Sequence, residues 1–73
     1  MESIYNDVSS LYQEALEARF DYLLFPHQGE TRTLLKIAAL QATMRLFVQE
    51  GPVAIDRLNR EAAIQLAALA HLN

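Results

Sequence analysis

The glycines and prolines of this chain are confined to two short segments, and this distribution constrains the fold more than any other feature. Pro26 and Gly29 lie in the first segment, and Gly51 and Pro52 lie in the second. Because both residue types interrupt helices, the stretches between them can form three helices of roughly twenty residues each. We therefore expect an all-α fold, a helical hairpin or three-helix bundle, with helices at about residues 3–25, 31–50 and 52–72.

The length of 73 residues predicts one domain covering residues 1–73, and 52% of the residues are apolar. A core of this size seldom supplies more than about 3–5 kcal/mol, and the absence of cysteine excludes disulfides as reinforcement. We therefore expect the fold to be completed by dimerisation or by a partner protein. No apolar run approaches the roughly 20 residues of a membrane helix, and no basic and apolar leader is visible, so we expect a cytoplasmic protein.

The first predicted helix has an apolar arc of roughly 200°, about twice the stripe that packs a surface helix onto a core. One neighbouring helix cannot cover such an arc. Ser3 is the expected N-cap, and Pro26 disfavours helical backbone at Phe25 and so sets the expected end.

Aromatic and acidic residues are concentrated in this first segment. It contains five of the six aromatic residues, and it carries a net charge of −4 whereas residues 26–73 carry +1. One interpretation is that the aromatic rings belong to the core. The second is that they form an interface, because tyrosine is enriched at protein contacts. The second interpretation predicts a partner-binding surface on this helix, made of Tyr5, Asp7, Tyr12, Glu14, Glu17, Phe20 and Asp21.

The second predicted helix carries two apolar stripes on opposite sides. The bulky stripe consists of Ile37, Leu40, Met44, Phe47 and Val48. The alanine-rich stripe consists of Leu35, Ala38, Ala39, Ala42 and Leu46. We expect both sides to be buried. Either the helix is the middle element of a bundle, or it packs within its subunit on one side and across a dimer on the other.

The second break is expected to be tight, with Gly51 in a glycine-favouring conformation and Pro52 in the first turn of the third helix. The first break is longer, so we expect substitution of Gly29 to be tolerated better. The third helix has one clean core stripe, and its charged residues are expected outside; the stripe is Ile55, Leu58, Ala62, Leu66 and Leu69.

No constellation for catalysis or for cofactor binding is visible. His27 and Glu30 give two metal ligands in one loop, whereas a structural zinc site needs four and a catalytic one three, so we expect no metal site. The bases Arg32, Lys36 and Arg45 lack interleaved aromatic residues in an acidic chain, and we expect no nucleic-acid binding.

These observations favour a small non-enzymatic helical interaction module. Such a module would bind and modulate a larger protein or complex as an inhibitor, in the way of phage- or plasmid-type regulators of host machinery such as RNA polymerase. The alternative is a self-assembling homodimeric structural or adaptor protein. A small metal-dependent enzyme that uses His27 is the least favoured interpretation.

Overall fold

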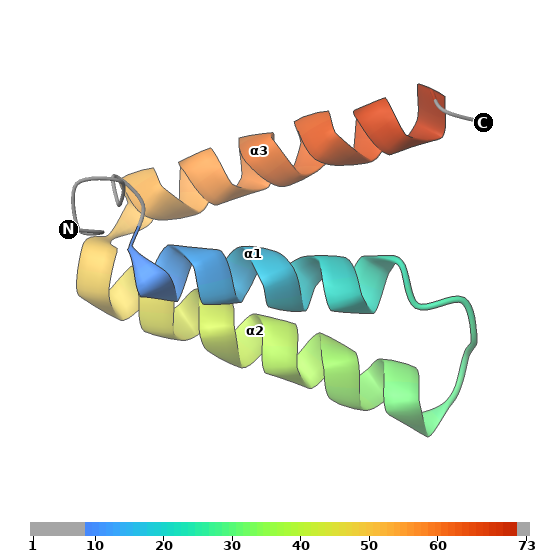
Figure 1. The fold of residues 1–73 in the computed structure, drawn as a ribbon. Helices are drawn as coiled ribbons and strands as arrows, with labels where there is room; N and C mark the ends of the chain where they lie inside the picture. The colour runs from blue at the N-terminus through green and yellow to red at the C-terminus, as the bar shows by residue number, and fades with distance from the viewer. Residues whose placement is uncertain (1–8, 72–73) are drawn as a thin grey trace, which may run out of the picture.

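The computed structural model describes residues 9–71, which form three α-helices joined by two short connections (Figure 1). Helix α1 spans Ser10–Leu23, α2 spans Glu30–Glu50 and α3 spans Pro52–His71. Within the described residues there is no strand, so the predicted all-α fold is confirmed. Both connections fall in the segments that contain the glycines and prolines.

Helix α1 begins at Ser10, later than the expected position 3. The backbone of Ser9 is extended, with a ψ of 158°, and its side-chain oxygen accepts a 3.1 Å hydrogen bond from the backbone N–H of Tyr12. This bond satisfies one of the free N–H groups at the start of a helix. Ser9 is therefore the N-cap of α1, and the predicted cap Ser3 lies outside the described residues.

A single residue, Gly51, connects α2 to α3. Its φ of 84° is a conformation that residues with a Cβ atom rarely adopt, and its N–H donates a 2.8 Å hydrogen bond to the carbonyl of Phe47. Pro52 is the first residue of α3, where the missing N–H leaves no helical hydrogen bond unmade. The predicted tight turn is confirmed.

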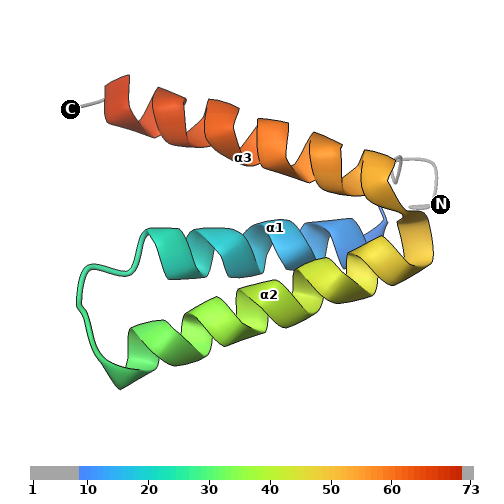
Figure 2. The same cartoon turned by 180° about the vertical axis from the view of Figure 1, so that it is seen from behind.

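The three helices form an open arrangement. Helices α1 and α2 lie side by side as an antiparallel hairpin, and α3 runs back along α1 (Figures 1 and 2). Near Pro52 the third helix is close to the hairpin, and toward His71 it diverges from it. The buried residues of α3, Leu58 and Ala62, accordingly lie in its first half.

The core is small and is built largely from alanine. It centres on Tyr12 and Ala15 of α1, Ala42 and Leu46 of α2, and Leu58 of α3. Leu46 and Leu58 are the largest side chains that are fully buried in the described part of the chain. Because α1 contributes to contacts with both other helices, its wide apolar arc is covered from two sides, as its width predicts.

Helix α2 is buried on one side only, which corrects the expectation that both of its stripes are buried within the chain. Its alanine-rich side, with Ala39, Ala42 and Leu46, packs inward because small side chains let the α1 backbone approach closely. The bulky side faces outward. Helix α2 contacts both α1 and α3, but neither covers its bulky stripe, and packing of that stripe across a dimer remains a prediction.

Candidate interaction surface

Tyr12, which we expected at a partner-binding surface, is a core residue. Its side chain is 3% exposed, and its hydroxyl donates a 2.5 Å hydrogen bond to Oε1 of Glu61 in α3. The guanidinium carbon of Arg57 lies 4.9 Å from the centre of the Tyr12 ring, within the range of a cation–π contact. Tyr12 therefore connects α1 to α3 and is not available to a partner. Arg57 and Glu61, which were expected outside the core, contact it, and we call these three residues the Tyr12 joint.

Burial raises the pKa of the Tyr12 phenol from 10.0 to about 12, and the hydrogen bond to Glu61 and the charge of its carboxylate act in the same direction. The guanidinium of Arg57 acts in the opposite direction and is outweighed. The phenol therefore stays neutral and keeps its proton as a donor at neutral pH. This chemistry serves the packing of two helices and gives no acid or base at a surface.

The remaining residues of the predicted surface are divided between different environments. Glu14, Glu17 and Asp21 are exposed, Phe20 is partly buried, and Tyr5 and Asp7 lie outside the described residues. A carboxylate oxygen of Glu14 lies 3.7 Å from a guanidinium nitrogen of Arg45 on α2, an exposed ion pair that contributes little to stability. The structure thus keeps three acidic side chains together on α1 but separates them from Tyr12, and their binding role stays a prediction.

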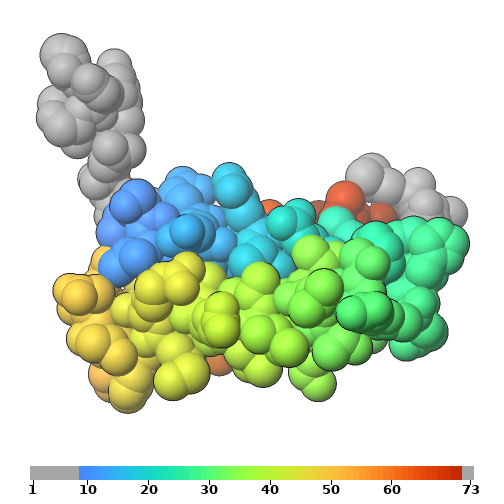
Figure 3. Space-filling view, turned by 90° about the horizontal axis from the view of Figure 1, so that it is seen from below, coloured from blue at the N-terminus to red at the C-terminus, as the bar shows by residue number. Residues whose placement is uncertain are grey.

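A different surface is much more apolar: the outward side of α2. We define the α2 outer face as six large apolar residues that are 44–75% exposed, namely Leu34, Ile37, Leu40, Met44, Phe47 and Val48. Figure 3 views the hairpin from the side away from α3, with α1 and α2 lying side by side and no other helix in front of α2. Single exposed apolar residues are normal on a protein surface, but a contiguous patch of this kind marks an interaction site or an aggregation hazard.

The spacing within the α2 outer face is that of a helix that pairs with another helix. Ile37, Leu40, Met44 and Phe47 follow one another at intervals of three, four and three residues, which is the a and d pattern of a heptad repeat. The four side chains therefore form a seam roughly 15 Å long on one side of the helix. This pattern was visible in the sequence as the bulky stripe; only its exposure required the structure.

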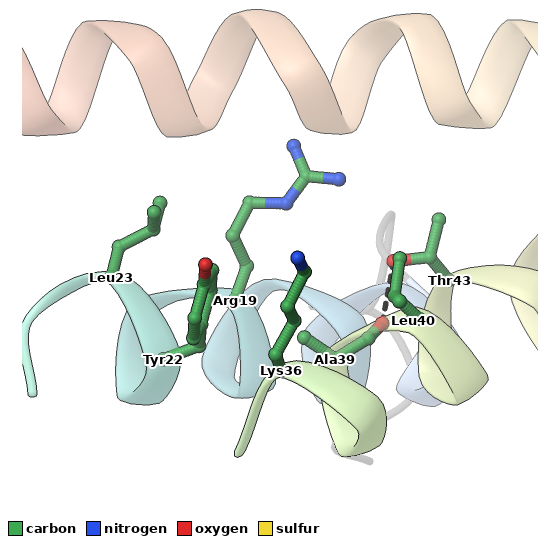
Figure 4. A pocket seen from close by; sticks show the side chains of 7 residues that line it. All are labelled: Arg19, Tyr22, Leu23, Lys36, Ala39, Leu40 and Thr43. Atoms are coloured by element: carbon green, nitrogen blue, oxygen red, sulfur yellow. Dashed lines mark hydrogen bonds between the residues drawn. The ribbon is translucent and has the colours of Figure 1, made fainter. Parts of the chain in front are cut away.

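A shallow pocket opens where α3 diverges from the hairpin. It has a volume of about 260 Å³ and is lined by Arg19, Tyr22, Leu23, Lys36, Ala39, Leu40 and Thr43. Arg19 and Lys36 extend from α1 and α2 toward the side of α3 (Figure 4), and Nη1 of Arg19 donates a 2.6 Å hydrogen bond to Oδ1 of Asn59. The pocket is smaller than the 300–1,000 Å³ usual for ligand sites, and Leu40 links it to the α2 outer face.

The described residues show neither a metal-ligand cluster nor a membrane-spanning helix. Residues 9–71 contain no group of three or more histidine, cysteine, aspartate or glutamate side chains placed to hold a metal ion. His27 is exposed in the first connection, with its ring 5.9 Å from that of Phe25 in an edge-on arrangement. Among the three helices, none combines the length and the apolar character that crossing a membrane requires.

Comparison with known proteins gives no match to this chain among family models, curated proteins or solved structures.

Proposed function

We propose that this chain is a non-enzymatic protein-interaction module that docks other protein surfaces through the α2 outer face. The observation that carries the proposal is the exposure of six large apolar side chains on one side of one helix. Buried apolar area is the dominant favourable term in protein association, and helix-in-groove and helix-pairing contacts use anchors at this spacing. Modulation of a larger complex, as phage- or plasmid-type regulators act on host machinery, belongs to the same proposal.

The acidic side of α1 gives this module a second feature that supports binding. Glu14, Glu17 and Asp21 are exposed on a segment that carries most of the negative charge of the chain. Charges at the rim of an interface mainly accelerate encounter with a basic partner, whereas the buried apolar anchors determine how long the complex lasts. The α2 outer face is thus the proposed anchor, and the acidic side of α1 is the proposed steering surface.

A photo-crosslinking experiment tests the proposed docking surface. A benzophenone amino acid is placed at Met44, within the α2 outer face, and in a matched control at Gln13, which is exposed on α1. Irradiation in a lysate of the encoding organism should give adducts from position 44, with a second copy or with another protein, and few from position 13. Equal labelling from both positions, or no adduct at position 44, would overturn the proposal.

A further inference from the structure

We propose that the occupant of the α2 outer face is the α2 helix of a second copy of this chain, packed antiparallel about a two-fold axis level with residue 42. This inference rests on the proposed function and specifies its partner. The observations that carry it are the heptad spacing of the exposed seam and the positions of the two charged residues that flank it.

The seam is self-complementary in the antiparallel orientation. In antiparallel helix pairs, an a position lies opposite a d position of the other helix. An axis level with residue 42 places Ile37 opposite Phe47 of the second copy and Leu40 opposite Met44 of the second copy, and the symmetry repeats both pairs. Every large residue of the seam then has an apolar residue opposite it, which gives four continuous layers.

One flank of the seam carries charges whose signs match in this orientation. Lys36 and Glu50 are both exposed, and they are two heptads apart, so they lie on the same strip of α2 with Thr43 midway between them. The proposed axis brings Lys36 opposite Glu50 of the second copy at one end and creates the same pair at the other end. Flanking charges of this kind select partner and orientation in paired helices.

A parallel pair does not produce these contacts. In parallel pairing, a flanking residue meets the position five residues further along the other helix. Lys36 would then meet Gln41 of the second copy, and Thr43 would meet Val48. Opposite charges face one another only in the antiparallel arrangement. On the other flank, that arrangement pairs Leu34 with Val48 of the second copy, and Gln41 with Gln41 of the second copy.

The monomer also has a physical reason to associate. Its core contains mostly alanine, and Leu46 and Leu58 are the large side chains that it fully buries among the described residues. Small domains with so little buried volume commonly gain stability from oligomerisation. In the monomer, by contrast, the largest apolar surface of α2 faces water, and a second copy supplies a seam of matching length and spacing.

Sedimentation equilibrium of the full chain over a concentration series is the first measurement, and a reversible dimer is expected. Charge reversal then tests the register. Lys36→Glu and Glu50→Lys each turn two attractive contacts into two repulsive ones, so each should raise the dimer dissociation constant about tenfold at low salt. The double variant, and an equal mixture of the two single variants, should both restore the affinity of the original chain.

Destabilisation of the monomer should not imitate this loss and rescue of dimer affinity. Both side chains are exposed, and a lysine at the last residue of α2 interacts favourably with the helix dipole. Gln13→Lys, which places a new charge on the exposed side of α1, is the matched control and should leave the dissociation constant unchanged. Met44→Glu should abolish the dimer while circular dichroism shows retained helix. If Met44→Glu unfolds, the charge reversals still decide the question.

The chain contains no cysteine, so single introduced cysteines report orientation without background. Gln41→Cys should form an intermolecular disulfide, because position 41 faces itself across the axis. Glu50→Cys should not, since its two copies would lie about 24 Å apart along the pair. A dimer in which the charge reversals show no mutual rescue, or in which position 50 crosslinks to itself, would overturn the antiparallel register.

A chain that stays monomeric at all concentrations while position 44 crosslinks to a different protein would overturn the second-copy inference and leave the proposed function standing. A monomer whose position 44 crosslinks to nothing would overturn both.

Discussion

The hydroxyl of Tyr12 in α1 donates a 2.5 Å hydrogen bond to Oε1 of Glu61 in α3, across 49 positions of the chain. With Arg57 over the same ring, this contact fixes the first half of α3 to the start of α1. Beyond Ala62 the third helix has no buried residue among those described, and it diverges from the hairpin. The open shape of the molecule begins where this joint ends, and the pocket between α1 and α2 lies on the side of the hairpin that faces α3.

The Tyr12 joint predicts a loss of stability in alkali. The phenol has a pKa of about 12 in the folded chain and an ordinary value of 10.0, so the folded state holds its proton more tightly than the unfolded state does. The stabilisation is complete below pH 10 and is lost as the pH rises from 10 to 12. The loss should be on the order of 2 kcal/mol in the free energy of unfolding, measured by urea titration at several pH values.

Tyr12→Phe is the control for this prediction. It removes the titrating group, so the difference between the two proteins isolates Tyr12 from every other group that titrates in the same range. The variant should be less stable than the original chain at neutral pH, and the difference should shrink above pH 10. If the stability difference between the two proteins stayed the same from pH 8 to 12, the joint would not be what raises the pKa of the Tyr12 phenol.

The core predicts which leucines determine monomer stability. Leu46 is fully buried, and Leu46→Ala should lower the free energy of unfolding by about 2–5 kcal/mol at any protein concentration. Leu40 is 55% exposed, so Leu40→Ala should matter little in dilute solution and more as the proposed dimer forms. Chemical denaturation at two protein concentrations checks both. Equal, concentration-independent losses for the two variants would contradict the assignment of Leu40 to an outer face.

Helix positions follow from local sequence signals, and this is why they could be predicted. Gly51 and Pro52 end α2 and start α3 at the expected positions, whereas α1 ends at Leu23, two residues before the end that Pro26 predicts. The start of α1 differs from the expected one: its N-cap is Ser9, which has an extended backbone and a side-chain hydrogen bond to the N–H of Tyr12, whereas the expected cap Ser3 lies outside the described residues.

The choice of buried face depends on contacts between distant residues, and the sequence does not contain it in any local pattern. Both stripes of α2 are apolar, and the alanine-rich one packs inward because Ala39 and Ala42 allow close approach to α1. In the same way, an aromatic ring at helical spacing could be core or surface. Tyr12 is core because Glu61, far along the chain, accepts its hydrogen bond.

The two connections should be equally intolerant of side chains at their glycines, which differs from the expectation that substitution of Gly29 is tolerated better than that of Gly51. Gly29 has a φ of 123° and Gly51 a φ of 84°, and both combine this with an extended ψ, a region essentially limited to glycine. Gly29→Ala and Gly51→Ala should each cost about 1–3 kcal/mol in thermal unfolding experiments. Gln28→Ala, an exposed neighbour, should stay within about 0.5 kcal/mol of the original.

Amide hydrogen exchange should divide α3 into two parts. Residues up to Ala62 are held by Leu58 and by the Tyr12 joint, whereas Ile64 is 68% exposed and Leu69 is 42% exposed. Few buried contacts mean a small free energy of local opening, so amides after Ala62 should exchange faster than those before it. Uniform protection along the whole helix, measured by NMR, would mean that another surface covers its second half.

The acidic side of α1 predicts a salt-dependent association rate. Glu14→Gln combined with Glu17→Gln removes two exposed charges, and the free energy of unfolding should change by less than about 1 kcal/mol because exposed charges contribute little. Association with a basic protein that binds this chain should slow, and the difference from the original chain should vanish as salt is raised. Stopped-flow measurements at two salt concentrations check this. Because the α2 outer face lies on a different helix, the dimer dissociation constant should not change. A large change in that constant would place these carboxylates at the contact between copies. An unaltered association rate at low salt would mean that the carboxylates only keep the surface solvated.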